Sequence, residues 1–374
     1  MILGSAYPLR GGLAAYNERL ARAYLQNGDD AEIVTFSLQY PGFLFPGKTQ
    51  YSSEAPPTDL KITARLNSVN PLSWIKTGKT IRRQKPDLLI IKFWLPFMGP
   101  SLGTVARIVR KNRHTKIISI LDNIIPHEKR PGDIALARYF VKYVDGFVAM
   151  SDEVMNDLSR FDTEKPRAFC PHPLYDFGKL RSKAEARKAL GLETEEKYIL
   201  FFGFIRDYKG LDLLLKAMAD KRLKEKDIRL VVAGEFYTDD KPYFDMIEQL
   251  KIGERVIMSN DFIPDSKVAD YFNAADLVVQ PYKDATQSGV TQIAYHFEKP
   301  MITTNVGGLA EIVPDGRVGY VVNPDEKEIA DAVDKYFEEK KEKEFADNIK
   351  IEKQKYSWER MLETINKIVA HDIS

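Results

Sequence analysis

Two cations stand three residues apart in the segment FFGFIRDYKG, where they could bind a diphosphate. Arg206 and Lys209 follow an apolar run, at the point where a buried strand would end. Open parallel sheets bind their ligands at the carboxyl ends of the strands. The pair could clamp a diphosphate and neutralise the charge that grows on a leaving group. Two exposed loop cations are the simpler interpretation, but Gly203 and Gly210 on either side favour a functional loop.

A second segment, QPYKDATQSGVTQIAYHFEKPMITTNVGGLAEIV at 280–313, predicts a strand, a polar loop and then a helix. The helix would begin near Ser288 and Gly289, where backbone N–H groups and the helix dipole attract phosphate. Asp284 and Gln292 lie eight positions apart and flank this helix start. The segment is therefore interpreted as a nucleotide-sugar site.

Two further loops carry candidate residues. In YPLRGGLAAY, Gly11 and Gly12 would let a ligand approach the backbone at the start of a helix. A Gly-Gly turn alone is more often structural. In DNIIPHEKR, His127 could hydrogen-bond a sugar or shuttle a proton. Asp122 and Glu128 could instead form a carboxylate pair, although a loop gives that pair no fixed geometry.

Missing motifs exclude several classes of protein. The chain has no G-x-G-x-x-G, which argues against a dehydrogenase. No His, Cys and Asp cluster has metal-ligand spacing, and the basic-aromatic pattern of nucleic-acid binders is absent. We therefore expect no metal, no cofactor and no nucleic-acid partner.

Composition indicates an ordinary globular protein of 374 residues, 44% hydrophobic and 29% charged. The single cysteine, Cys170, fits a reducing compartment. There is no run of about 18 apolar residues and no signal-peptide pattern at the N-terminus. We expect a cytoplasmic location.

Charge is divided unevenly along the chain. Residues 1–172 carry 24 Lys and Arg against 16 Asp and Glu, whereas 173–374 carry 31 against 38. A basic first half could meet an anionic membrane or an acidic acceptor, so the location could be peripheral on the inner face of a membrane. Scattered solvated charge is the alternative, including for the four cations of the helix predicted at 105–113.

Strand-like runs alternate with amphipathic helical runs along most of the chain. Strands are expected at 1–4, 31–36, 87–93, 116–121, 146–150, 198–202, 229–233, 256–258, 277–280, 300–304 and 319–322. Helices are expected at 13–26, 100–112, 135–143, 182–190, 211–219 and 265–274, with a charged helical segment at 326–355. Such alternation predicts parallel sheets covered on both faces. Prolines near 171 indicate the boundary between domains at 1–170 and 171–355, followed by an amphipathic helix at 356–374.

The order of these motifs resembles that of family 4 glycosyltransferases with the GT-B fold. The resemblance rests on the GG loop, DNIIPHE, FFGFIRDYKG, VVAGE and SGVTQIAYHFEKPMITTNVGGLAEIV, and it covers nearly the whole chain. It implies an α/β architecture of two Rossmann-like parallel-sheet domains that face a central cleft. A nucleotide-sugar donor would be held mainly by the second domain, and the terminal helix would cross back to the first. Transfer would retain the anomeric configuration without a metal.

The resemblance also assigns roles by position. Arg206 and Lys209 match the pair that grips the donor diphosphate, and His127 and Asp284 match residues near the transferred sugar. The other donor-binding positions are Gly11, Gly12, Gly203, Gly234, Glu235, Ile263, Gln287, Ser288, Gly289, Val290 and Gln292.

One position departs from the family pattern. The family has E-x(7)-E, but Asp284 and Gln292 give D-x(7)-Q here. A neutral amide binds ribose hydroxyls more weakly than a carboxylate, because charge-assisted hydrogen bonds are about twice as strong.

The leading expectation is a retaining, metal-independent glycosyltransferase for a glycan or lipid-linked acceptor, as in surface-polysaccharide assembly. A GT-B-like nucleotide-sugar epimerase or phosphorylase and a non-catalytic nucleotide-binding relative are the alternatives.

Overall fold

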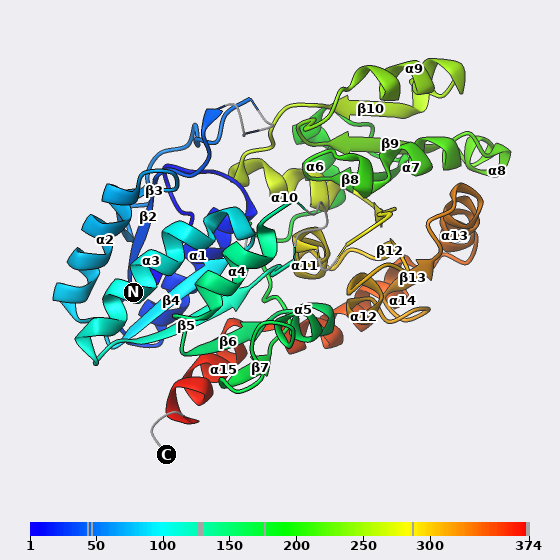
Figure 1. Cartoon of the computed structure of the whole chain (residues 1–374). Helices are drawn as coiled ribbons and strands as arrows, with labels where there is room; N and C mark the ends of the chain where they lie inside the picture. Colours follow the sequence, from blue (N-terminus) through cyan, green and yellow to red (C-terminus); the bar gives the residue numbers. More distant parts are fainter. Residues whose placement is uncertain (43–44, 46–47, 126–129, 176, 286–287, 372–374) are drawn as a thin grey trace. The chain divides into compact units, whose positions relative to one another are not determined.

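The protein is described by a computed structural model that covers the chain except residues 43–44, 46–47, 126–129, 176, 286–287 and 372–374 (Figure 1). The chain divides into two compact units, Met1–Pro173 with Tyr356–Ser374, and Leu174–Lys355. Each unit is built on a parallel sheet with helices on both faces. The predicted α/β fold of two parallel-sheet units is confirmed.

The first unit has a seven-stranded parallel sheet in the order β3-β2-β1-β4-β5-β6-β7. The chain moves outward from β1 to β3 and returns beside β1 with β4, which is the Rossmann order extended by one strand. The strands are β1 Ile2–Leu3, β2 Glu32–Leu38, β3 Lys61–Asn67, β4 Leu88–Phe93, β5 Lys116–Leu121, β6 Gly146–Ala149 and β7 Arg167–Phe169. The central strands are nearly all apolar because both of their faces are buried.

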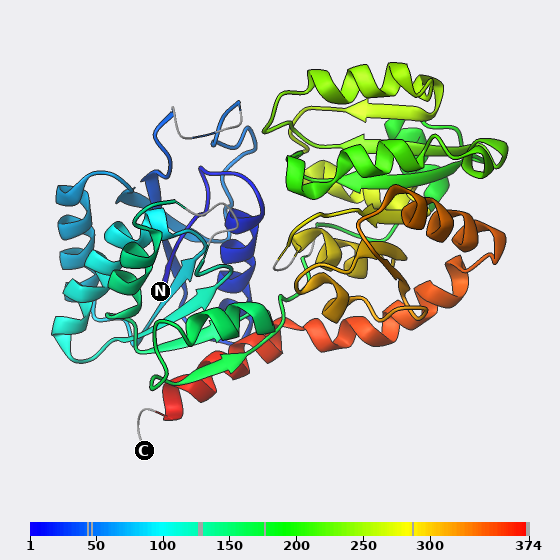
Figure 2. The same ribbon diagram turned by 45° about the vertical axis from the view of Figure 1, so that its right-hand side comes forward.

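Helices cover both faces of this sheet. They are α1 Gly12–Gln26, α2 Pro71–Gln84, α3 Gly99–Val109, α4 Asp133–Val141, α5 Asp152–Leu158 and α15 Trp358–His371, with 3-10 turns η2 Pro96–Met98 and η3 Arg110–Asn112. Figure 2 shows α2 and α3 on one side of the sheet and α1 on the other. Helix α15 packs on β5, β6, β7 and α1. The final helix of the chain is therefore part of the first unit.

The second unit has a six-stranded parallel sheet in the order β10-β9-β8-β11-β12-β13. Its strands are β8 Lys197–Phe202, β9 Ile228–Ala233, β10 Val256–Ser259, β11 Leu277–Gln280, β12 Met301–Thr304 and β13 Gly319–Val322. Its helices are α6 Lys183–Leu190, α7 Leu211–Ala217, α8 Lys221–Glu225, α9 Lys241–Gln249, α10 Asp265–Ala274, α11 Gly289–His296, α12 Leu309–Ile312, α13 Glu326–Glu338 and α14 Glu342–Glu352, with 3-10 turns η4 Asp207–Lys209, η5 Gly253–Arg255 and η6 Lys353–Tyr356. The order changes direction between β8 and β11, which is where open sheets bind ligands.

Local sequence fixes where several helices begin and end. Ser182 and Glu185 form a reciprocal capping box at the start of α6, and Gly191 ends that helix in the left-handed conformation with φ 68°. At the start of α11, the Ser288 hydroxyl accepts a hydrogen bond from the N–H of Val290. The helix start predicted near Ser288 is confirmed.

Candidate functional site

The loop after β8 is shaped by two glycines. Gly203 has φ +98° and Gly210 has φ +68°, both in the region that favours glycine. A Cβ on Gly210 would lie 1.9 Å from the carbonyl oxygen of Pro281, the residue that follows β11. The N–H of Lys283 also donates to the carbonyl of Tyr208. The loops after β8 and β11 are thus held together at the switch point of the sheet.

Arg206 and Lys209 both lie in this loop. Among the described residues, neither side chain has a carboxylate or hydrogen-bond partner. The neighbouring carboxylates are engaged elsewhere, since Asp207 accepts from the Tyr243 hydroxyl and Asp212 pairs with a lysine of the β11 loop. Burial, and then repulsion from Arg206, lowers the pKa of Lys209 to about 7. Two adjacent cations, of which one has a lowered pKa, are expected where an anion completes the site.

An aromatic ring lies beside each of these cations. The guanidinium carbon of Arg206 is 5.2 Å from the ring centre of Tyr237, and Nζ of Lys209 is 5.5 Å from that of Tyr282. Both distances are within the range of cation–π attraction.

Close backbone contacts place the end of β9 against the end of β8. A Cβ on Gly234, which has φ +152°, would lie 2.0 Å from the carbonyl oxygen of Gly203. The N–H of Gly203 donates to the carbonyl of Ala233, which ends β9. Glu235 follows and is buried. These glycines are needed for backbone packing, whatever their contact with a ligand.

The start of α11 lies beside the same glycine. A Cβ on Gly203 would be 3.1 Å from Nζ of Lys209 and 3.5 Å from Cγ2 of Val290. The Tyr282 and Ser288 hydroxyl oxygens are 3.3 Å apart. The structure therefore brings together the predicted residues Gly203, Lys209, Ser288 and Val290 with Gly289 between the last two. The N–H groups of a helix start attract anions, so this end of α11 is suited to a phosphate.

Gln292 is fully buried, and neither atom of its amide has a hydrogen-bond partner among the described residues. Gln280 is buried beside α11, where it accepts from the Thr291 hydroxyl at 3.1 Å. Thr303 of β12 pairs with Gln280 in the sheet. The Gln280 Nε2 and the Thr303 hydroxyl also have no hydrogen-bond partner among the described residues. A carboxylate in place of Gln292 would be costly here, since burying an unpaired charge costs more than burying an amide.

The remaining predicted residues fall in three groups. Asp284 is exposed after β11, and Ile263 is half-buried after β10. Gly11 and Gly12 belong to the first unit, where Gly11 precedes α1 with φ +96°. His127 and Gln287 lie outside the described residues.

Sequence reasoning did not find a buried polar cluster in the first unit. Lys92 of β4 is 1% exposed, and its Nζ lies 2.8 Å from Asp122 and 3.4 Å from the ring centre of Tyr16. Burial, followed by repulsion from Lys92, lowers the pKa of His172 to about 3. Asp122 therefore pairs with Lys92, and its alternative partner Glu128 lies outside the described residues. The sequence feature that could have revealed this buried cluster is Lys92, a single lysine inside an apolar strand.

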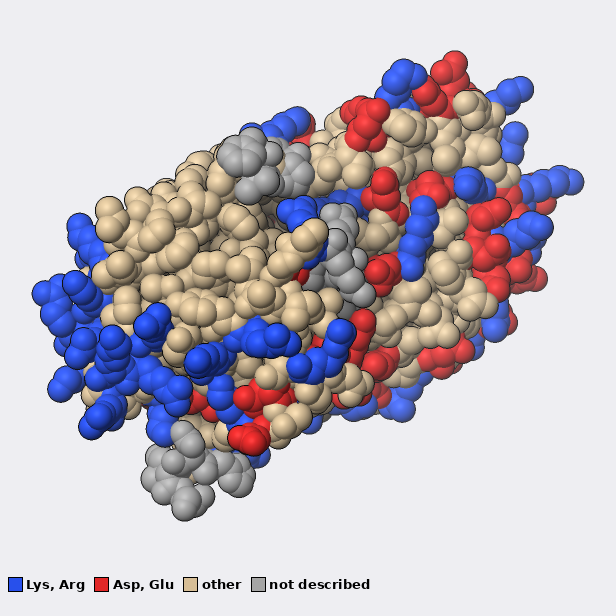
Figure 3. Space-filling view, in the orientation of Figure 1, with Lys and Arg blue, Asp and Glu red and all other residues tan. Residues whose placement is uncertain are grey.

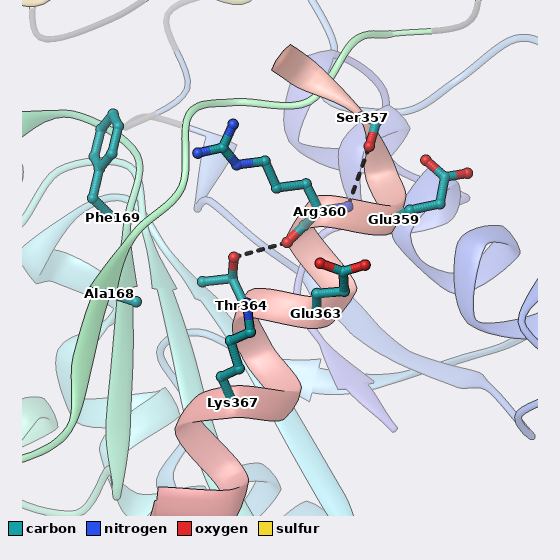
Figure 4. A pocket seen from close by; sticks show the side chains of 8 residues that line it. All are labelled: Ala168, Phe169, Ser357, Glu359, Arg360, Glu363, Thr364 and Lys367. Atoms are coloured by element: carbon teal, nitrogen blue, oxygen red, sulfur yellow. Dashed lines mark hydrogen bonds between the residues drawn. The ribbon is translucent and has the colours of Figure 1, made fainter. Parts of the chain in front are cut away.

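The first unit also carries a surface pocket and a basic surface. A pocket of about 480 Å³ lies between the end of β7 and α15 (Figure 4), and its helix side carries Glu359, Arg360, Glu363 and Lys367. The mixed charges on one helix face do not converge on a ligand position. Lys and Arg side chains gather over α2 and the end of α3 (Figure 3). Within the part of the chain that the structure describes, none of the helices has the length and apolar character needed to cross a bilayer.

The second unit matches a known family. Residues 182–355 match the family model described as "Glycosyl transferases group 1". A D-inositol 3-phosphate glycosyltransferase of Catenulispora acidiphila is 29% identical over 193 residues, which are 49% of this chain and 45% of the relative. An uncharacterized glycosyltransferase of Methanocaldococcus jannaschii is 31% identical over 191 residues, 49% of this chain and 47% of the relative. The chain spans about half the length of the curated relatives it matches.

Solved structures resemble the whole chain. The sucrose-phosphate synthase of Thermosynechococcus elongatus has a TM-score of 0.76 at 16% identity, covering 100% of this chain and 98% of that one. Anabaena HepE, solved with UDP and glucose, has a TM-score of 0.75 at 15% identity, covering 99% of each chain. These similarities show the fold, an α/β chain of two Rossmann-like parallel-sheet units, as predicted from the motifs.

Proposed function

We propose that the chain transfers a sugar from a nucleotide-sugar donor to a hydroxyl acceptor. The match of residues 182–355 to the family model "Glycosyl transferases group 1" supports this proposal. Transfer is proposed to retain the anomeric configuration and to need no metal. Relatives named as glycosyltransferases and a fold neighbour solved with UDP and glucose support the donor class.

The observation that carries this proposal is the pair Arg206 and Lys209. Two cations without a carboxylate partner in the described part lie in a loop at the switch point of the sheet, near the start of α11. Partly buried cations without counter-ions cost free energy in the empty protein. A diphosphate would offset that cost with charge-assisted hydrogen bonds.

The proposed chemistry is a front-face displacement. The acceptor hydroxyl attacks the anomeric carbon on the face from which the diphosphate leaves, and a phosphate oxygen takes the hydroxyl proton. Arg206, Lys209 and the N–H groups at the start of α11 stabilise the negative charge that develops on the leaving phosphate. Asp284, which is exposed beside this loop, is proposed to accept hydrogen bonds from the transferred sugar. Exclusion of water would favour transfer over hydrolysis.

Replacing Arg206 by alanine is expected to weaken binding of a nucleoside diphosphate by about 10- to 100-fold, because one charge-assisted bond is lost. Titration calorimetry with a panel of nucleoside diphosphates would measure the change. Arg160→Ala, at an exposed arginine of the first unit, is the matched control and should leave the affinity unchanged. An Arg206→Ala protein that binds as tightly as the unmodified one would contradict the diphosphate assignment.

Product analysis separates the proposed function from its alternatives. A transferase releases nucleoside diphosphate rapidly only when an acceptor is present. Conversion of the sugar nucleotide in the absence of an acceptor indicates the epimerase instead. Tight binding without turnover on any acceptor indicates a non-catalytic relative.

We further propose that the acceptor is a glycan or lipid-linked and that the first unit touches an anionic membrane surface. The exposed basic residues of α2, of η3 and of the position after η3 are Lys76, Lys79, Arg82, Arg83, Arg110, Lys111 and Arg113. Exposed apolar side chains stand at the start of α2, where Leu72 is 76% exposed. Basic residues near an anionic lipid surface contribute about 1 kcal/mol each.

Binding to vesicles is expected to need anionic lipid and to weaken with salt. Co-sedimentation with phosphatidylcholine vesicles, with and without phosphatidylglycerol, would measure it. The double variant Lys79→Glu with Arg83→Glu should lose at least about tenfold in vesicle affinity. Lys216→Glu, an exposed lysine of the second unit, is the matched control. Equal binding to both kinds of vesicle would contradict a contact based on charge.

A further inference from the structure

An aromatic ring lies beside the guanidinium of Arg206. The guanidinium carbon lies 5.2 Å from the ring centre of Tyr237, and no carboxylate pairs with the guanidinium among the described residues. An aromatic face attracts a cation through its quadrupole and uses none of the N–H groups of the cation. A carboxylate would occupy those N–H groups and would compete with a diphosphate for them.

The ring of Tyr237 packs on Phe204, which in turn packs on Phe262. Phe204 stacks on Tyr237 with ring centres 4.3 Å apart and an interplanar angle of 29°. Phe262 follows β10 and lies 6.0 Å from Phe204 at 28°. The three half-buried rings thus form a stack across the carboxyl ends of β8, β9 and β10.

The backbone ties this stack to the cation loop. The N–H of Tyr237 donates to the carbonyl of Ile205 at 2.9 Å, and the N–H of Ile205 donates to the carbonyl of Glu235 at 2.9 Å. Ile205 directly precedes Arg206. The position of the Tyr237 ring relative to Arg206 is therefore fixed by both main-chain bonds and ring packing.

We propose that Tyr237 is a positioning residue for Arg206: its ring, stacked on Phe204, holds the guanidinium ready for the donor diphosphate without neutralising it. This rests on the proposed function, because it gives Arg206 a diphosphate to bind. Pre-positioning reduces the side-chain entropy that binding would otherwise remove. Tyr237 would act on binding of the diphosphate and not on the base or sugar.

The test compares Tyr237→Leu with Tyr237→Phe, using two ligands. Inorganic pyrophosphate probes the diphosphate contact alone, and the best-binding nucleoside diphosphate of the panel probes the whole nucleotide. Tyr237→Leu is expected to weaken both ligands by the same factor, about 3- to 30-fold. Tyr237→Phe keeps the ring face and should restore the affinity for both.

A double-variant cycle shows whether Tyr237 acts through Arg206. If it does, Arg206→Ala with Tyr237→Leu binds pyrophosphate no more weakly than Arg206→Ala alone. If Tyr237→Leu instead damages the structure in general, the double variant should bind pyrophosphate more weakly than Arg206→Ala alone. Thermal unfolding of each variant without ligand confirms that the fold is retained.

The outcomes separate this proposal from the proposed function. If Tyr237→Leu weakens the nucleoside diphosphate but not pyrophosphate, the ring contacts the base and the proposal is wrong. It is also wrong if Tyr237→Leu changes neither ligand while Arg206→Ala weakens both. If Arg206→Ala changes neither ligand, the diphosphate site itself is wrong, and the proposed function is not supported.

Discussion

We expect the affinity for a nucleotide-diphosphate sugar to fall about tenfold per pH unit above pH 7. Burial and repulsion from Arg206 lower the pKa of Lys209 to about 7 in the empty site, so the lysine loses its charge as the pH rises through 7. A bound diphosphate favours the charged amine and raises its pKa, so binding above pH 7 takes up a proton. The affinity is highest below pH 7. It stops falling at the pH where the Lys209 amine in the complex also loses its proton.

Calorimetry in buffers of different ionisation enthalpy would measure both the affinity and the proton taken up. The diphosphate of a sugar nucleotide has no proton to lose in this range, which leaves the lysine as the titrating group. Lys209→Arg should remove the pH dependence, because arginine stays charged. Arg206→Ala should move the fall to higher pH, because it removes the repulsion from Lys209. A flat profile for the unmodified protein between pH 7 and about pH 9 would contradict this account.

Replacing Lys92 by methionine is expected to destabilise the first unit by about 3–5 kcal/mol. Lys92 is 1% exposed and pairs with Asp122 at 2.8 Å. Methionine has a similar shape but no charge, so the variant leaves a largely buried carboxylate without its cation. The variant also lacks the contact between the Lys92 ammonium and the ring of Tyr16. A desolvated cation–π contact contributes about 2 kcal/mol.

The three tryptophans make the measurement selective. Trp74, Trp94 and Trp358 all belong to the first unit, so their fluorescence during urea unfolding reports on that unit. Lys111→Met, at an exposed position, is the matched control and should change stability by less than about 0.5 kcal/mol. The double variant Lys92→Met with Asp122→Asn should recover much of the loss, because it removes both charges. Equal stability of Lys92→Met and the unmodified protein would show that the pair contributes little.

The sequence predicted the strands that are buried on both faces. Strands β5 and β11 have the predicted bounds, because an unbroken apolar run between polar loops marks such strands clearly. Strands β3 and β7 were missed. In β3, Lys61–Asn67, only one residue is fully buried, and β7 has three residues at the edge of the sheet. Edge strands carry little apolar pattern because one of their sides meets solvent.

The candidate site was predictable only in its loop residues. Arg206 and Lys209 could be placed at the end of a strand from sequence alone, because polar residues after an apolar run mark a loop. Their aromatic neighbours could not, since Tyr237 and Phe262 follow other strands and approach Phe204 only once the sheet has formed. The burial of Gln292 could not be predicted from the sequence either. A glutamine at the second turn of a helix is compatible with either a ligand or a core.

Helix α15 has a consequence for how the chain is made. Its residues Met361, Ile365 and Ile368 are buried in the first unit, and Ile368 lies against Gly146 of β6. Domains generally fold in the order in which they are synthesised. Here the first unit lacks part of its own core until residues 358–371 have left the ribosome, long after the contiguous residues 174–355. The unit whose synthesis begins first is therefore the last to be completed.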